Sequence, residues 1–216
     1  MNENETVPLA TFLSSLKGGE DVVVEYRSED PLHVVFNSLL KTLRGIGKRF
    51  VILDELDQLH IIRAHTELSG MDAGLIDECK VIKLGGIINT GNVIGRIELS
   101  EEPPLRKKRY ERILKELGEE KKFRIMVGFD KLLRSYENDP RELEKIFGYL
   151  VRVHLGNPER VIMYLINREI IGEKSLKELR EHATRVLELN FEKDKPVLRV
   201  IKSIHTGETG RKIKLN

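Results

Sequence analysis

Short apolar runs alternate with amphipathic segments along this chain. The first run is Val22-Val23-Val24, and after Asp30-Pro31 the apolar residues from Leu32 to Leu43 recur at helical spacing. A buried strand followed by a helix is the repeating unit of parallel sheets, which are covered by helices on both faces. The pattern therefore predicts an α/β fold with a mainly parallel central sheet flanked by helices.

The same pattern continues to the end of the chain. We expect strands at Val22–Val24, Arg49–Asp54, Val81–Leu84, Phe123–Phe129, Val161–Ile166, Arg185–Phe191, Pro196–Ile204 and Arg211–Leu215. Helices are expected at Leu9–Leu16, after Asp30-Pro31, at Glu55–Leu68, at Pro103–Leu117, from Pro140 and at Ser175–Thr184. Around the glycines from Gly85 to Gly95, Ile87-Ile88 and Val93–Leu99 are expected to form irregular or hairpin strands. The closely spaced last strands predict an antiparallel C-terminal edge, and residues 1–216 are interpreted as a single domain.

Charge and cysteine content narrow the class of protein. The 37 Lys and Arg residues nearly balance the 35 Asp and Glu residues, so a basic site for nucleic acid would have to be local. The high charged fraction and the absence of Trp fit a thermophilic protein. The single cysteine, Cys79, excludes an intramolecular disulfide and suits a reducing cytosol. No stretch approaches the ~20 apolar residues of a membrane helix, so we expect a soluble, cytoplasmic protein.

The turn after the first central strand contains no glycine. In a P-loop, several glycines let backbone N–H groups surround phosphates, a Lys reaches the terminal phosphates, and a Ser or Thr holds magnesium. Residues 25–30 read Glu-Tyr-Arg-Ser-Glu-Asp. Glu29 and Asp30 would repel a triphosphate, so this turn argues against ordinary ATP hydrolysis.

Several phrases in this order nevertheless resemble the RecA-like P-loop ATPases, and within them the archaeal KaiC-like branch. The phrases are Phe50–Glu55, Leu68–Asp72, Val127–Leu133 and Leu198–Lys202. The chain also looks like a small archaeal family of unknown function that belongs to this branch without its P-loop. The resemblance covers roughly residues 8–216 and implies a RecA/KaiC-like fold.

The resemblance also points to site residues. Asp54 and Glu55 stand where family members activate water, although these carboxylates could instead open a helix and favour its dipole. Asp130 matches the Walker B aspartate, or is a turn residue. Lys202 matches a Lys that reaches nucleotide on a neighbouring subunit, but the Arg expected two residues later is Ile204. We therefore favour a non-catalytic pseudo-ATPase with a binding or regulatory function over a divergent hydrolase that uses Asp54, Glu55 and Asp130.

Other patterns suggest partners. A basic segment from Arg106 to Arg112 could bind nucleic acid on a helix, but glutamates surround it, which is typical of a solvated, ion-paired face. The scattered histidines do not predict a metal site, and we expect no cofactor. A protein partner or self-association is the preferred interaction. Candidate partner-binding residues are Tyr26, Asn89, Asn92, Arg96 and Lys202, with the Gly85–Gly95 loop.

Overall fold

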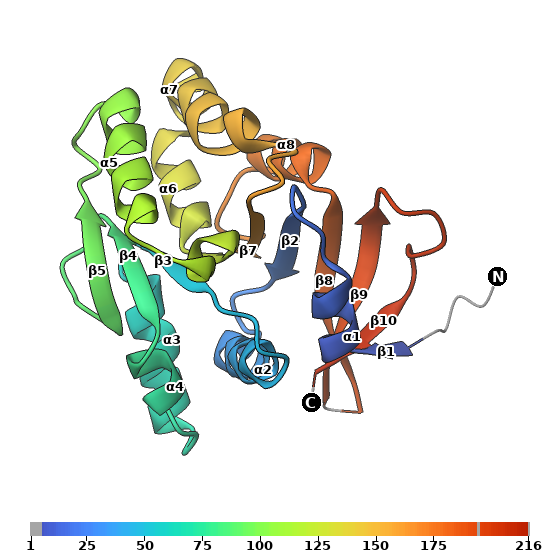
Figure 1. The fold of residues 1–216 in the computed structure, drawn as a ribbon. Helices are drawn as coiled ribbons and strands as arrows, with labels where there is room; N and C mark the ends of the chain where they lie inside the picture. Colours follow the sequence, from blue (N-terminus) through green and yellow to red (C-terminus); the bar gives the residue numbers. More distant parts are fainter. Residues whose placement is uncertain (1–5, 194, 216) are drawn as a thin grey trace.

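The computed structural model describes residues 6–193 and 195–215. Within them, a ten-stranded sheet has the strand order β1-β10-β9-β8-β2-β7-β6-β3-β4-β5 (Figure 1). The strands are β1 (Thr6–Pro8), β2 (Asp21–Tyr26), β3 (Val51–Glu55), β4 (Lys80–Leu84), β5 (Asn92–Ile97), β6 (Phe123–Val127), β7 (Val161–Asn167), β8 (Arg185–Glu192), β9 (Lys195–Ser203) and β10 (Lys212–Lys214).

Strand direction divides the sheet into two parts. Every neighbouring pair from β8 through β2, β7, β6, β3 and β4 to β5 is parallel. At the other end, β9 runs antiparallel to both β8 and β10, and β1 pairs parallel with β10. The predicted α/β class, with a mainly parallel sheet and an antiparallel C-terminal edge, is confirmed.

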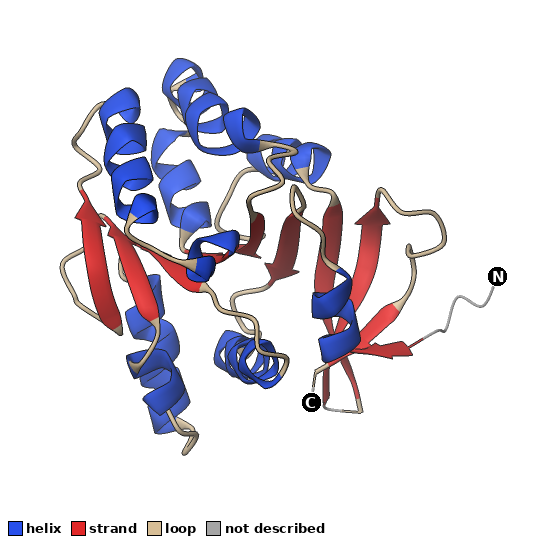
Figure 2. Cartoon of the chain, viewed as in Figure 1, coloured by secondary structure: helices blue, strands red, loops and turns tan. Residues whose placement is uncertain are grey.

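Helices cover both faces of the sheet, as Figure 2 shows. One face is covered by α1 (Leu9–Ser15), α2 (Leu32–Gly45), α3 (Gln58–Leu68) and α4 (Gly74–Asp77). The other is covered by α5 (Pro103–Lys115), α6 (Phe129–Tyr136), α7 (Pro140–Ile146) and α8 (Glu173–His182). Short irregular helices η1 (Glu119–Lys122), η2 (Phe147–Val151) and η3 (Arg152–His154) complete the chain.

The valine run shows why the sequence selects this arrangement. Successive side chains of a strand point to opposite faces. Val22 and Val24 pack into the layer beneath α2, whereas Val23 packs into the layer beneath α5 to α8. A strand that is apolar at every position therefore needs a helix layer on each side, because each layer removes its apolar surface from water.

Two local expectations were wrong. The helix expected from Glu55 begins at Gln58, because Leu56 and Asp57 adopt left-handed backbone conformations (φ 51° and 62°). Asp54 and Glu55 therefore belong to β3 and do not open a helix. Of the irregular or hairpin strands expected after β4, the hairpin is absent from the described residues: residues 85–91, with Ile87-Ile88, cross back along the sheet, and β5 pairs parallel with β4 with a shift in register between Val81 and Ile82.

Among the described residues, no helix has both the length and the apolar character needed to cross a membrane.

Candidate functional site

The chemistry-bearing residues gather at the carboxyl ends of the parallel strands. Tyr26, Glu55 and Asn167 are the last residues of β2, β3 and β7, and Asp130 follows β6 by three residues. In open α/β sheets this edge is where ligands bind, since the loops that leave it can diverge to either face. We call these four residues, with their neighbours below, the carboxyl-edge site.

The β2–α2 turn occupies the P-loop position, and three of its N–H groups are already bonded. The Arg27 N–H donates to Asp30 Oδ2 at 2.6 Å, and the Ser28 N–H donates to Glu169 Oε2 at 3.0 Å. The Asp30 N–H donates to the carbonyl of Arg27 at 3.1 Å. The backbone N–H of Ser28 holds the pKa of Glu169 below its usual range. The chain's own carboxylates thus take the donors that would surround a phosphate.

Glu25, one residue before the strand ends, is also committed to the protein itself. Its carboxylate accepts two hydrogen bonds of 2.6 Å from the Nε and Nη2 atoms of Arg180 on α8. This two-point geometry is the strong form of an Arg–carboxylate pair. Because Glu25 is fully buried, the pair fastens α8 to the central strand.

Asp54 is paired with a lysine. The Lys83 ammonium lies 2.7 Å from Asp54 and 2.5 Å from Asp57, and Lys83 and Asp54 are fully buried. Asp54 also accepts the Leu59 N–H at 2.8 Å. The Asp54 carboxylate is therefore neutralised from within the fold.

Glu55 and Asp130 are the most deeply buried carboxyls of the site without a close ion pair. The Glu55 oxygens have no hydrogen-bond partner among the described residues, although the charge of Arg106 acts on them. The backbone N–H groups of Lys131 and Asn167 partly offset the burial of Asp130. Burial raises the pKa of Glu55 well above its usual value, and the charge of Asp130 adds to that shift. Burial also raises the pKa of Asp130 to about 6. Two neighbouring carboxyls with raised pKa values can exchange protons near neutral pH, which is the chemistry expected of general acids and bases.

The candidate partner-binding residues do not form one surface. Tyr26 is buried, and the ammonium of Lys202 donates to the carbonyls of Arg180 and Glu181 at the end of α8. Arg96 donates to the Gly86 carbonyl at 2.7 Å and to Asn89 at 2.6 Å, so both residues brace the loop between β4 and β5. Asn92 is exposed at the start of the edge strand β5.

The basic segment is split by the geometry of α5. Arg106 is only 5% exposed and faces the sheet. On the outer side, Lys107 pairs with Glu111 at 3.4 Å and Arg109 pairs with Glu101 at 2.7 Å. Arg106 is therefore separated from the exposed basic residues of this helix, which include Lys108 and Arg112.

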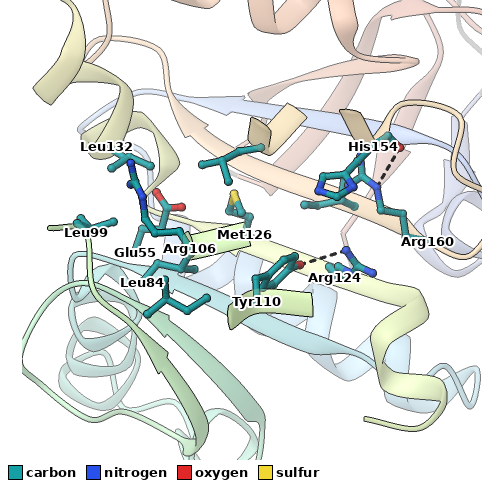
Figure 3. Close-up of a pocket in the computed structure, with 13 residues that line it drawn as sticks. Glu55, Leu84, Leu99, Arg106, Tyr110, Arg124, Met126, Leu132, His154 and Arg160 are labelled. Carbon is teal, nitrogen blue, oxygen red and sulfur yellow. Dashed lines mark hydrogen bonds between the residues drawn. The ribbon is translucent and has the colours of Figure 1, made fainter. Parts of the chain in front are cut away.

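Beneath α5 lies a cavity that joins the two ends of the strands (Figure 3). Glu55 and Arg106 line one end, and Arg124, His154 and Arg160 line the other. About 30 Å³ is open to water-sized molecules, room for roughly two waters. The sequence interpretation missed this cavity, although Arg106, Tyr110, Ile113 and Leu117 recur at the spacing of one helix face. Over the described part of the chain, no cluster of three or more His, Cys, Asp or Glu side chains could hold a metal ion.

Comparisons with known proteins locate the chain among archaeal proteins. The family model described as "Pyrococcus protein of unknown function, DUF257" matches residues 11–214. A Pyrococcus horikoshii OT3 protein, solved as structural project PH0250, is 23% identical, with a TM-score of 0.79 over 95% of this chain and 97% of that one. This likeness shows a shared fold. The flagellar accessory protein FlaH of Methanocaldococcus jannaschii is 14% identical, with a TM-score of 0.43 over 87% of this chain and 80% of that one. That value is too low to support an argument. No curated protein matches the chain.

Proposed function

We propose a function on the premise that the chain belongs to the DUF257 family of Pyrococcus proteins of unknown function. The protein is a non-catalytic binding or regulatory module, a pseudo-ATPase in the sense of the RecA/KaiC-like resemblance. The observation that carries this proposal is the β2–α2 turn, where Asp30 and Glu169 accept the N–H groups of Arg27 and Ser28. A phosphate would have to displace two carboxylates and then lie among their charges, which costs rather than gains free energy.

The state of the acidic residues supports the same proposal. A hydrolase would use Asp54, Glu55 and Asp130 to orient water or magnesium, which requires ionised oxygens that face the substrate. Asp54 instead bonds Lys83, and burial favours the protonated form of Glu55. Burial raises the pKa of Asp130 to about 6, which still leaves it mainly ionised at neutral pH. The divergent-hydrolase alternative therefore depends on a rearrangement at this edge when substrate binds.

Calorimetric titration with magnesium and ATP tests the proposal. We expect no binding tighter than the millimolar range in the wild-type protein. The Asp130→Ala variant serves as the control for the alternative. Micromolar affinity in the wild type that disappears in Asp130→Ala would overturn the pseudo-ATPase proposal in favour of the hydrolase.

The proposal extends to a protein partner or to self-association through the faces beside the former nucleotide site. The loop from Gly85 to Gly91 supports this extension because Ile87 is 88% exposed on it and Ile88 is partly exposed. Light scattering at tens of micromolar is expected to show a dimer or larger species that does not respond to ATP. An Ile87→Ser variant is expected to shift this species toward monomer. Leu68→Ser is the matched control, since Leu68 is also an exposed aliphatic residue but lies at the end of α3, away from this loop. A strictly monomeric wild type contradicts self-association and leaves a separate protein partner.

A further inference from the structure

The helix α5 is weakly attached to the sheet that it covers. It is 13 residues long, yet of its described side chains only Arg106 and Ile113 are buried, while Tyr110 and Leu114 are partly buried. The helix α6 on the same face buries four of its 8 residues, three of them apolar. Burial of apolar surface is the main force that holds a helix on a sheet. For its length, α5 therefore gains little from its position.

Ile113, the buried apolar residue of α5, rests on the edge of the sheet. It packs on Gly95 of the edge strand β5, where an added β-carbon would lie 2.6 Å from the Ile113 Cδ1 atom. Glycine allows this close approach because it has no side chain. The buried apolar contact of α5 is thus at the border of the sheet and not over its centre.

Arg106, the other buried side chain, holds α5 less firmly than an apolar residue would. Its guanidinium lies beside the buried Glu55 carboxyl in Figure 3, and the two charges attract each other. The attraction within a buried ion pair is largely offset by the hydration that both groups lose. Both groups regain water when α5 moves away, so this contact opposes such a movement only weakly.

The space beneath α5 is incompletely filled. Arg106 and Tyr110 line, together with Met126 of the sheet, a cavity with about 30 Å³ open to water-sized molecules. Side chains around a cavity lack packing partners on that side and lose the attraction of those contacts. A hydrogen bond of 3.1 Å from Arg124 to the Tyr110 hydroxyl links α5 to the central strand β6. The ion pairs on the outer face of α5 stay within the segment and do not reach the sheet.

We propose that α5 is a lid, which opens while the sheet and the remaining helices stay folded. Local opening of this kind occurs where a segment has few buried apolar contacts. Glu55 and Met126 line the cavity beneath α5, so opening brings water to both of them. The lid depends only on how α5 is held, and it is therefore independent of the proposed lack of ATPase activity.

Hydrogen exchange of the wild-type protein is the first test. We expect the backbone amides of α5 to have protection factors at least ten-fold lower than those of α6, and to exchange with almost no dependence on added urea. A low urea dependence identifies an opening that exposes little surface. Equal protection in the two helices, or exchange from α5 with the urea dependence of global unfolding, overturns the proposal.

Two substitutions separate lid opening from global unfolding. Leu40→Ala removes buried contacts of α2 on the opposite face, so we expect at least ten-fold faster exchange in β2 and unchanged exchange in α5. Ile113→Ala is expected to accelerate exchange in α5 at least ten-fold, whereas Leu105→Ala, at a half-exposed position of the same helix, is expected to leave it unchanged. If Leu40→Ala accelerates α5 as much as β2, then α5 opens only with the whole protein and the proposal is wrong.

Labelling of an introduced thiol measures access beneath the lid. In a Cys79→Ser background, Met126→Cys places a thiol under α5, and Met163→Cys places one under the helices of the opposite face. We expect a thiol reagent to label Met126→Cys at least ten-fold faster than Met163→Cys, because only the first position is uncovered by α5. Equal labelling rates contradict the lid. If a variant does not fold, the urea dependence of exchange in the wild type decides the question.

Discussion

Lys83 and Asp54 stand directly opposite each other on the neighbouring parallel strands β4 and β3, and their side chains form an ion pair of 2.7 Å with no exposed surface. The strand register brings both side chains to the same face of the sheet. Taking two charges out of water is expensive, and the pair compensates that cost only while both members are present. The role of Asp54 in this structure is therefore to stabilise the packing of β3 on β4 through its ion pair with Lys83.

Removing one member of this pair is expected to be strongly destabilising. Lys83→Met leaves the Asp54 carboxylate buried without its cation, and we expect the free energy of unfolding to fall by about 3–5 kcal/mol. Asp54→Leu combined with Lys83→Met is expected to lose less than Lys83→Met alone, because the fully buried Asp54 carboxylate is no longer left without its cation. Guanidinium chloride denaturation measures both variants.

The matched control for that series is a surface pair. Lys107→Met breaks the ion pair with Glu111, which is a partly exposed i,i+4 pair on α5. Its effect is expected to stay within about 0.5 kcal/mol. A Lys83→Met variant that behaves like Lys107→Met would show that the buried Lys83–Asp54 pair does not stabilise the fold.

Asp130 predicts a pH dependence of stability. Its pKa rises from 3.8 to about 6 because burial disfavours the charged form. Between these values the folded chain holds a proton that the unfolded chain has lost, so stability falls as the pH rises through this window and levels off above about pH 6. Asp130→Asn removes this contribution, and we expect the variant to exceed wild type by roughly 3 kcal/mol at pH 8 and to match it near pH 3. Urea denaturation across this pH range measures the difference.

Asp21 sharpens the interpretation of that experiment. Burial raises its pKa to about 6 as well, partly opposed by Arg160. The wild type and Asp130→Asn both keep Asp21, so its contribution cancels in the difference between the two curves. A difference that does not change with pH would contradict the raised pKa of Asp130.

The basic helix yields a prediction for nucleic acid. Because Arg106 faces inward, Lys107 and Arg109 are paired with glutamates and the net charge of the chain is only +2, we expect no binding tighter than micromolar at physiological salt. Replacing Lys107, Lys108, Arg109 and Arg112 together by Ala is expected to leave a mobility-shift assay unchanged. Submicromolar binding that weakens in this variant, with a smaller salt slope, would favour a nucleic-acid-binding function.

The order of elements could be predicted from the sequence because fully buried parallel strands are apolar at every position. The Val22–Val24 run shows this, since both of its faces pack beneath helices. Which side chain pairs with each carboxylate of the site could not be predicted in the same way. Whether Asp54 faces a reacting water or Lys83 depends on the pairing of β3 with β4, and this pairing joins residues 29 positions apart. The residues around Asp54 in the sequence do not indicate which residue of the neighbouring strand lies opposite it.

Arg106 shows the opposite case, in which a local signal existed but a stronger one concealed it. The run of basic residues from Arg106 to Arg109 suggests one exposed patch, whereas the spacing of Arg106, Tyr110, Ile113 and Leu117 indicates an inward face. A run of basic residues does not show which of them point outward, because successive residues of a helix point in different directions. For a short helix that covers a sheet, the position around the helix decides which arginine is buried.

Gly86 is expected to be essential for the loop that leaves β4. Its backbone is left-handed (φ 70°), and a β-carbon there would lie 2.6 Å from the carboxyl carbon of Asp57. That carboxylate accepts the N–H groups of Ile87 and Ile88 and also bonds Lys83, so it cannot move away without breaking all three contacts. Gly86→Ala is therefore expected to destabilise the protein by more than the ~1 kcal/mol that left-handed strain alone costs.

Gly47→Ala is the matched control, because Gly47 has nearly the same φ (71°) and nothing within 4 Å of the added carbon. Hydrogen exchange at Ile87 and Ile88 should accelerate in Gly86→Ala but not in Gly47→Ala. Equal unfolding free energies for the two variants would mean that the loop yields to the added methyl, and that Asp57 does not fix it.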